Sequence, residues 1–399
     1  MWQVSDIFKQ TLRQEHQYAC KAVLLDTDFQ EVEGGTIFSA NQTNNISNFI
    51  SDGNVDVDTT RGTRRTSELT LLNPTAEFTP ATEDFDPEGP WVGKIYLNRV
   101  VRLYRGLYIV GTPTYVPVGT FMIDNAEILV ERNMSLVVLT MSDLWKKISK
   151  SYTLKPVNYP IGTPYMLIVR DIIADTGVDQ PLAPIIDNLD GRSDDEKTLA
   201  KKLTIEEGTS RGDWLKERCA EWDIDAYFDP MGRFIVQDRK AARDKAQVWH
   251  FYSSEDRTGM LTNVRRSFTD DNLYNHVIVI GGGADNPIRR ERVDTNPSSK
   301  TNIDLIGDRV WMIKDDKIDS GAKADKALNK AWDVRFQITE TVQCDTICNP
   351  ALEGDDVIRI TEKDYAKIDS QYRLSRFTVP LVSSRQTIQV TNIRKETDF

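Results

Sequence analysis

The sequence predicts a mostly β fold with an α+β insert: β-rich regions at 1–150 and 251–399, separated by a smaller α+β unit at 151–250. Three observations support this fold class. Short runs of alternating polar and apolar residues indicate strands in both outer regions. Apolar residues recur at helical spacing in the middle region. No repeat of 20–50 residues is present, which argues against a solenoid or a propeller.

The composition fits a globular protein of two or three domains. The chain has 399 residues, and 39% of them are hydrophobic, which is enough for real cores. No apolar run reaches the ~18 residues of a membrane span, and the first residues do not resemble a secretory signal. The net charge of −11 argues against a surface that grips nucleic acid. The negative charge does not exclude a surface along which nucleic acid moves without binding.

The first region is expected to be a small β-barrel or sandwich, because many short strands follow one another closely. A short amphipathic helix is expected over 4–14. Strand patterns cover 18–25, 54–58, 65–72, 100–104, 108–110, 116–123, 127–130 and 136–141. A turn-rich passage runs through Gly34 and Gly35, and 75–93, rich in proline, glycine and acids, is expected to be a long surface loop.

The middle region combines helices with a hairpin. Helical spacing predicts helices over 164–175 and 210–222, with Ser210 as the N-cap of the second. Strands are expected on both sides of the Asp229–Gly232 turn, which has proline and glycine where a tight reversal needs them. The charged span 187–202 is expected to be a solvated loop or an exposed helix.

The last region returns to β structure around one amphipathic helix at 320–336. Its strand patterns cover 276–280, 310–313, 338–344, 356–361, 372–381 and 386–393. The strand at 276–280 runs into three glycines, as in a dinucleotide-binding fold. That fold needs a further glycine at position 286, where the chain has Asn286 followed by Pro287. We therefore interpret the motif as a strand that ends in a loop.

No pattern predicts catalysis, a cofactor or a metal. His16, His250 and His276 are far apart in the sequence, and Cys344 and Cys348 have no second ligand pair near them, so a zinc site is not expected. Carboxylates are numerous, so counting alone does not exclude a glycosidase pair. Eight tryptophans could bind sugars, but Trp145, Trp214, Trp222 and Trp332 are expected in cores, and Trp91 is expected to be exposed.

Several segments together resemble the hub proteins of phage tails. The order of these segments, more than any one of them, carries the resemblance. They are Arg-Arg-Thr-Ser-Glu-Leu-Thr-Leu-Leu-Asn-Pro (64–74), Val-Pro-Val-Gly-Thr-Phe-Met-Ile-Asp (116–124), Gly-Asp-Trp-Leu-Lys-Glu-Arg-Cys-Ala (212–220), Tyr-Phe-Asp-Pro-Met-Gly-Arg-Phe-Ile-Val (227–236), Asn-His-Val-Ile-Val-Ile-Gly (275–281) and Asn-Pro-Ala-Leu-Glu-Gly-Asp-Asp-Val-Ile-Arg-Ile (349–360).

The resemblance implies two tube-like β domains per subunit and a homotrimer whose ring matches the hexameric tail tube. It implies a minor tail protein of the virion, assembled in the host cytoplasm, with no shared catalytic residues. The expected partners are the tail tube or a distal tail protein, a spike, fibre or receptor-binding protein, and the tape-measure protein. DNA is expected to pass through the ring without specific binding.

The negative charge suggests which side chains line that channel. Acidic residues exceed basic ones in all three regions. In a threefold ring even a few inward acids repeat around the axis and repel phosphates. We expect the lumen to be more acidic than the outside, with Asp56, Asp58 and Glu127 as candidate channel-lining residues. The alternative function is a carbohydrate-binding or cell-wall-degrading protein of the tail tip.

Overall fold

The computed structural model describes most of the chain. The described residues are 1–26, 29–39, 48–79, 95–131, 134–174, 176–177, 185–189, 191–239, 245–253, 260–271, 273–282, 287–315, 318–335 and 339–392. Most of the loop predicted at 75–93 lies outside these residues, and so does Trp91.

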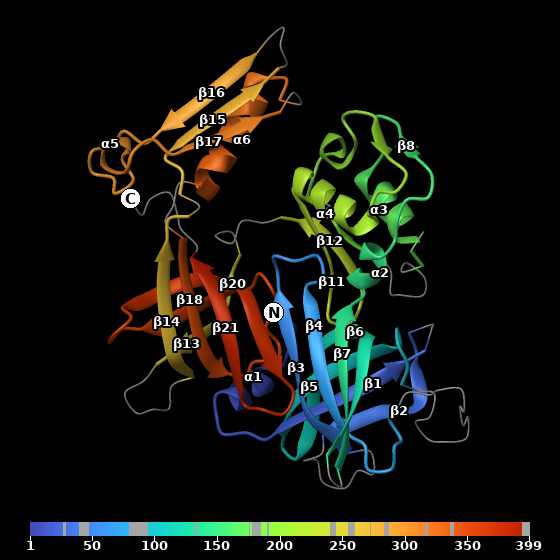
Figure 1. Ribbon diagram of the computed structural model, residues 1–399. Coiled ribbons are helices and arrows are strands. Elements are labelled where there is room, and N and C mark those ends of the chain that lie inside the picture. Colours follow the sequence, from blue (N-terminus) through green and yellow to red (C-terminus); the bar gives the residue numbers. More distant parts are fainter. Residues whose placement is uncertain are drawn as a thin grey trace.

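The first region consists of a short helix followed in sequence by seven strands that form a closed barrel (Figure 1). Its elements are α1 (Asp6–Leu12), β1 (Tyr18–Leu25), β2 (Glu31–Ser39), β3 (Asn48–Asp58), β4 (Arg65–Leu72), β5 (Val100–Ile109), β6 (Thr112–Glu131) and β7 (Met134–Asp143). Neighbouring strands follow the order β3-β2-β1-β5-β6-β7-β4, and β4 pairs back with β3. Ser5 caps α1 by accepting a hydrogen bond from Phe8 N.

Three predictions for this region need correction. The runs at 100–104 and 108–110 belong to one strand, β5, and those at 116–123 and 127–130 belong to one strand, β6. The passage through Gly34 and Gly35 is strand β2. Its pairing with β1 shifts register nearby, and Gly34 has a φ of +64°. A bulge in a strand tolerates glycines that otherwise indicate a turn.

The insert packs against one end of this barrel. Its elements are α2 (Trp145–Ser149), β8 (Val157–Tyr159), α3 (Tyr165–Ala174), β9 (Ile186–Asn188), η1 (Asp194–Lys197), β10 (Leu203–Ile205), α4 (Arg211–Glu221), β11 (Ile224–Phe228) and β12 (Phe234–Asp238). Both helices, the hairpin and the N-cap at Ser210 are confirmed. The span 187–202 is not simply solvated, because Leu189 and Leu199 are buried and β9 pairs with β12.

The second β region does not close into a barrel within the described residues. Its strands are β13 (Gln247–Tyr252), β14 (Leu261–Thr269), β18 (Thr339–Ile347), β19 (Val357–Glu362), β20 (Ile368–Pro380) and β21 (Arg385–Asn392). They follow the order β13-β19-β20-β21-β18-β14. The far end of β20 also pairs with β3, so the two β regions share one sheet and one hydrophobic core. The mostly β fold class is thus confirmed, while the domain boundaries at 150 and 250 stay a prediction.

A small unit with its own core interrupts the second region. It contains β15 (His276–Gly281), β16 (Ile288–Val293), α5 (Ile303–Ile306), β17 (Val310–Lys314) and α6 (Gly321–Arg335). Val277 and Val279 pack against Leu328 and Trp332 of α6. The segment after the glycines is strand β16, not the helix that a dinucleotide fold needs, which agrees with our interpretation of the motif.

The arrangement of these parts gives the molecule two different ends. In Figure 1 the insert and the small unit both lie above the shared sheet, while the opposite end of the sheet carries neither. Trp145, Trp214, Trp222 and Trp332 are buried in the cores of these two units, as predicted. None of the helices in the described part of the chain has the length and apolar character needed to cross a membrane.

Candidate functional site: a continuous sheet with two open edges

Eight strands from both β regions form one antiparallel sheet, which we call the continuous sheet. Its order is β6-β7-β4-β3-β20-β21-β18-β14, and every neighbouring pair is antiparallel. The long strand β20 makes this possible, because its first half pairs with β19 and its second half with β3. A single surface therefore runs from the barrel to the far edge of the second β region.

One face of the continuous sheet is polar, and the other forms the core. Side chains alternate between the two faces, so Val55, Leu69 and Val342 are buried in the shared core. The opposite face, which we call the polar face, carries hydroxyl and amide side chains with a few acids. Examples are Thr140, Ser142, Thr66, Glu68, Asp52, Asp56, Thr378, Thr387, Gln389 and Gln343. A sheet of this kind has one side exposed.

The three predicted channel residues all lie on the polar face. Asp56 and Asp58 are two residues apart on β3, and Asp56 accepts a hydrogen bond from Thr378 Oγ1 at 2.5 Å. Glu127 on β6 is opposite Val138, which is opposite Thr70, which in turn is opposite Asp52 on β3. The register thus places Glu127 on the same face, several strands away from the two aspartates. Their role in a channel stays a prediction.

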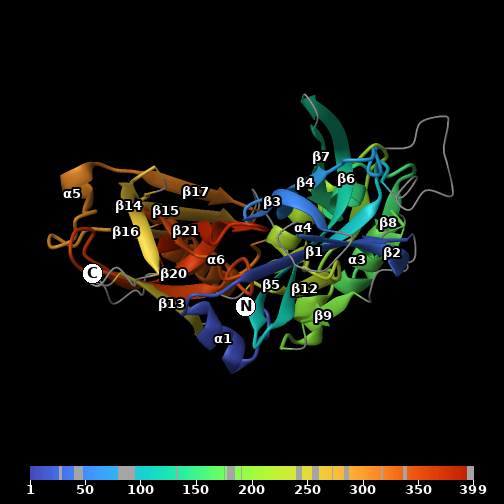
Figure 2. The same cartoon turned by 90° about the horizontal axis from the view of Figure 1, so that it is seen from below.

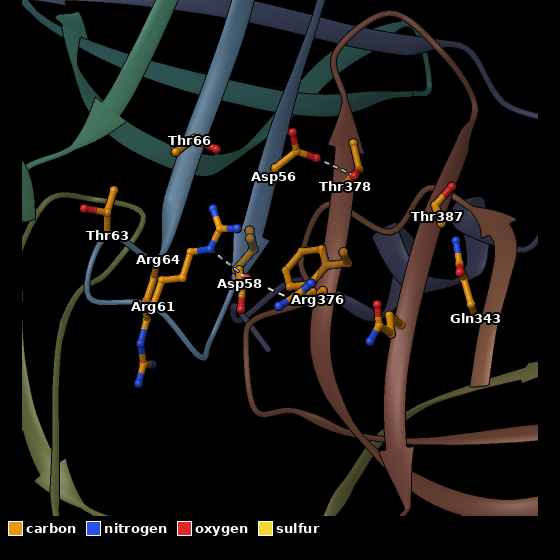
Figure 3. A pocket seen from close by; sticks show the side chains of 13 residues that line it. Asp56, Asp58, Arg61, Thr63, Arg64, Thr66, Gln343, Arg376, Thr378 and Thr387 are labelled. Atoms are coloured by element: carbon orange, nitrogen blue, oxygen red, sulfur yellow. Dashed lines mark hydrogen bonds and ion pairs between the residues drawn. The ribbon is translucent and has the colours of Figure 1, made fainter. Parts of the chain in front are cut away.

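Arginines that sequence reasoning missed offset part of this acidity. Asp58 lies in a groove of about 330 Å³ and pairs with Arg61 at 3.1 Å and Arg376 at 3.0 Å (Figure 3). Burial acts to raise the pKa of Asp58, but hydrogen bonds from Thr60 and the two guanidinium groups outweigh it, so this pKa is below its usual value. Of the three candidates, Asp58 is the one already neutralised by ion pairs.

The continuous sheet has an open edge at each end. β6 pairs with β5 up to Met122, the backbone of Ile123 still bonds to Asn98 and Arg99, and the rest of β6 pairs with β7 alone. At the other end, β14 pairs with β18 and with no other described strand. Figure 1 and Figure 2 both show β14 and β6 well apart, with β14 on the left side of the view. Unpaired backbone groups at such edges are available to another chain.

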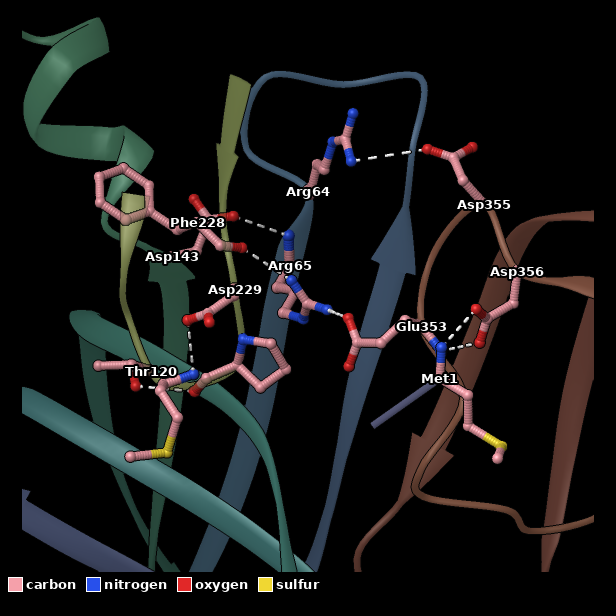
Figure 4. Close-up of polar contacts among 12 residues, drawn as sticks. Met1, Arg64, Arg65, Thr120, Asp143, Phe228, Asp229, Glu353, Asp355 and Asp356 are labelled. Atoms are coloured by element: carbon pink, nitrogen blue, oxygen red, sulfur yellow. Dashed lines mark hydrogen bonds and ion pairs between the residues drawn. The ribbon is translucent and has the colours of Figure 1, made fainter. Parts of the chain in front are cut away.

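A buried network at the centre keeps the parts of the molecule in fixed positions (Figure 4). Arg65, only 3% exposed, donates to the carbonyl of Phe228 at 2.9 Å and forms an ion pair with Glu353. Its backbone N–H donates to Asp143 at 3.0 Å. Burial raises the pKa of Asp143 to about 6. One arginine thus links the barrel, the insert and the second β region.

The turn between β11 and β12 anchors the insert on the barrel. Thr120 donates to the carbonyl of Pro230 at 2.9 Å, and Arg102 donates to that of Met231 at 3.0 Å. Gly232 ends this turn with a φ of +80°, which suits glycine. The predicted turn is therefore also a contact site, a role that its sequence did not indicate.

A second groove, of about 700 Å³, separates the insert from the second β region. Trp2 and Tyr227 line it together with five carboxylates. Each carboxylate already has a cationic partner: Asp229 with Arg233, Asp238 with Arg192, Glu353 with Arg65, Asp355 with Arg373, and Asp356 with the Met1 ammonium group. Among the described residues, no three His, Cys, Asp or Glu side chains gather as a metal site would require.

Comparisons with known proteins identify the fold. No family model and no curated protein matches the sequence. Among solved structures, a tail protein from Neisseria meningitidis superposes with a TM-score of 0.62 at 12% identity, over 94% of this chain and 97% of that one. The 43 kDa tail protein of prophage MuSo2 from Shewanella oneidensis gives 0.58 at 9%, over 94% and 98%.

A third similar structure comes from a Francisella PdpA–VgrG complex, with a TM-score of 0.55 at 9% identity, over 98% of this chain and 54% of that one. The first two matches extend over nearly the full length of both partners. The chain therefore has the fold of phage tail proteins, the class that its ordered sequence segments resemble.

Proposed function

We propose that the chain is a structural protein of a phage particle, the hub at the tip of the tail. Three copies form a ring that joins the hexameric tail tube to a spike, fibre or receptor-binding apparatus. The observation that carries this proposal is the continuous sheet, which has an open edge at each of its two ends. The fold shared with tail proteins supports it.

Strand direction makes a ring of this kind possible. The sheet contains eight strands, all antiparallel, so its first strand β6 and its last strand β14 run in opposite directions. In a head-to-tail ring, β14 of one copy meets β6 of the next, and the two are again antiparallel. Pairing there continues the alternation without a break and covers both open edges. An odd number of strands would not allow this.

The size of such a ring suits a channel. Three copies contribute 24 strands. At about 4.8 Å between strands and a tilt of about 35–40°, the backbone ring measures about 45–48 Å across. Side chains on the inner face leave a lumen of roughly 35 Å, estimated from the same spacings, which is wide enough for duplex DNA.

The polar face is the surface that would line this lumen. It carries hydroxyl and amide side chains, and of its described cations Arg376 pairs with Asp58, whereas Arg265, opposite Gln343, is exposed near the β14 edge. We propose that Asp56 and Glu127, repeated three times around the axis, make the lumen mildly acidic, while Asp58 with Arg61 and Arg376 contributes little. DNA then passes during ejection without specific binding. The role is structural, not enzymatic.

The location of the chain is directly testable. Antibodies against the chain, applied to intact particles and viewed by electron microscopy, should mark the distal end of the tail. Labelling of the capsid, or along the whole tail, would contradict the proposal. Particles assembled without the chain should lack the tip structures.

One observation favours the alternative function at the tail tip. The groove between Trp2 and Tyr227 combines aromatic rings with carboxylates, and burial raises the pKa of Glu353, as in some sugar-binding and sugar-cleaving sites. The ion pairs of those carboxylates favour a structural role instead. A glycan array and a peptidoglycan zymogram separate the two functions. Binding that is lost in Trp2→Ala, or clearing that is lost in Glu353→Gln, would establish the alternative.

A further inference from the structure

The free end of the β6–β7 hairpin exposes apolar side chains on the outer side of the sheet. We call this segment, Ile123–Glu131 with 134–137, the β6–β7 extension. Glu127 points to the polar face, so Ile128 and Val130 point to the opposite face. In the rest of the sheet that face is covered by the core, but here Ile128 is 42% and Val130 is 72% exposed. Ile123 and Val137 at the base of the extension belong to the core, whereas Ile128 and Val130 nearer its tip are apolar residues that the core leaves partly uncovered.

The other open edge, at β14, has an apolar groove that could receive such side chains. Beside β14 lies a groove of about 660 Å³, lined by Leu261, Val264, Phe268 and Tyr365 among others, which we call the β14 groove. Phe268 is 56% exposed and Tyr365 is 93% exposed, which is unusual for such large rings.

The polar members of the β14 groove already have partners within the chain. Arg266 donates to Glu340 at 2.8 Å and lies over the ring of Phe268 at 4.8 Å. It also donates to the carbonyl of Ala366 at 2.8 Å. What the groove offers to a partner is therefore mainly aromatic and aliphatic surface.

We propose that the β6–β7 extension of one copy docks beside β14 of the next and places Ile128 and Val130 in its groove. This inference rests on the proposed ring and names the contact that closes it. Both apolar surfaces lie on the outer side of the continuous sheet, because Phe268 is opposite the buried Glu340 on the core face. The two surfaces therefore meet when the edges pair.

Strand tilt brings the two segments to the same height. The register across the sheet places Met122 on β6 level with Thr262 on β14. Because the two strands are antiparallel, 123–131 and 262–269 extend in opposite directions from that level, so without tilt only their first residues would meet. A stagger of about eight residues per copy places 123–131 alongside 261–269. Eight strands tilted by about 35° produce that stagger, within the range of about 35–45° common in barrels.

Exposed apolar residues allow a test that does not disturb the fold. Ile128→Asp with Val130→Asp should leave the thermal unfolding of the chain unchanged and reduce ring assembly at least tenfold. The matched control is Val110→Asp, because Val110 is 99% exposed at the β5–β6 turn and takes no part in the proposed contact. Assembly that is unchanged by the double variant, or equally reduced by the control, would overturn the inference.

Cysteine pairs test the contact itself, in concentrated chain and in assembled particles. Ile128→Cys combined with Val264→Cys or Phe268→Cys should give covalent dimers and trimers on oxidation. Leu129→Cys combined with the same partners should not, because Leu129 points to the polar face. The four native cysteines are buried and do not interfere. A ring in which neither Ile128 pair cross-links would contradict this inference and leave the proposed function intact. Particles without any ring would contradict the proposed function itself.

Discussion

The two β regions have similar strand patterns in the sequence, but the first forms a closed barrel and the second forms an open sheet. In the first, β1 to β7 follow one another and close into a barrel. In the second, the small unit separates β14 from β18 in sequence, and β14 keeps one neighbour among the described strands. The closed region provides a projecting hairpin, and the open region provides an unpaired strand. Alternation of residues thus predicts strands, whereas closure depends on which strands meet.

The open region is nevertheless firmly attached to the closed one. Arg105 is buried on β5 and donates to the carbonyls of Leu381 and Ser383 at 2.8 Å each. Its guanidinium group also lies over the ring of Tyr18 at 4.2 Å. The turn between β20 and β21 is thereby held against the barrel. The angle between the two open edges is therefore set within one chain, as the proposed ring would require.

The largest expected effect comes from breaking the link between the regions. Arg65→Ala leaves Glu353 and the Phe228 carbonyl without their partner, so the free energy of unfolding should fall by about 3–5 kcal/mol. Denaturant unfolding measures it. The matched control is Arg61→Ala, because Arg61 is exposed and Asp58 keeps Arg376 as a partner, so the loss should be less than about 1 kcal/mol. Similar losses in both variants would mean that Arg65 does not link the regions.

A pH series tests the buried acid beside this link. Asp143 has a pKa of about 6 in the folded chain against 3.8 unperturbed, so the folded state takes up its proton first. Stability from this group therefore rises as pH falls from about 6 to 4, by about 3 kcal/mol in all. Asp143→Asn has no such dependence. The stability of the wild-type chain relative to this variant should increase as the pH falls, and a constant difference would contradict the assignment.

Substitutions at two glycines test how tightly the closed and the open region are packed, with smaller expected losses of stability. A Cβ at Gly106, in the barrel, would lie 2.2 Å from the backbone oxygen of Thr114. Gly106→Ala should therefore destabilise the chain by about 1–3 kcal/mol. At Gly354, in the second region, the nearest atom is Cγ2 of Thr59, at 2.5 Å, and a side chain moves more easily than backbone. Gly354→Ala should cost clearly less, and the reverse order in thermal unfolding would refute the comparison.

The smallest expected effect on stability comes from the predicted channel residues. Asp56→Lys with Glu127→Lys changes exposed side chains, so the free energy of unfolding should shift by less than about 0.5 kcal/mol. DNA ejection from particles carrying the variant should slow, because the new charges attract phosphates. Glu68→Lys adds half as much positive charge on the same face and should act in the same direction, with a smaller effect. Unchanged ejection in all of these variants would exclude an electrostatic role for the polar face.

Local signals account for what could be predicted from the sequence. A strand-like run located β1 and alternation located β4 at their observed bounds, and the Ser210 cap and the Asp229 turn depend on neighbouring residues only. β2 was missed because its glycines resemble a turn. The site depends on distant partners: Arg65 and Glu353 are 288 residues apart, and no local pattern indicates their ion pair. The polar face could be predicted in part, because its acids alternate along β3.

A reconstruction of the tail tip at a resolution that separates strands tests the central claim most directly. We expect three copies of the chain in one ring, with β14 of each copy antiparallel to β6 of the next and the polar face toward the lumen. A ring of six copies, a single copy at that level, or three copies whose β14 edges face solvent would contradict the account.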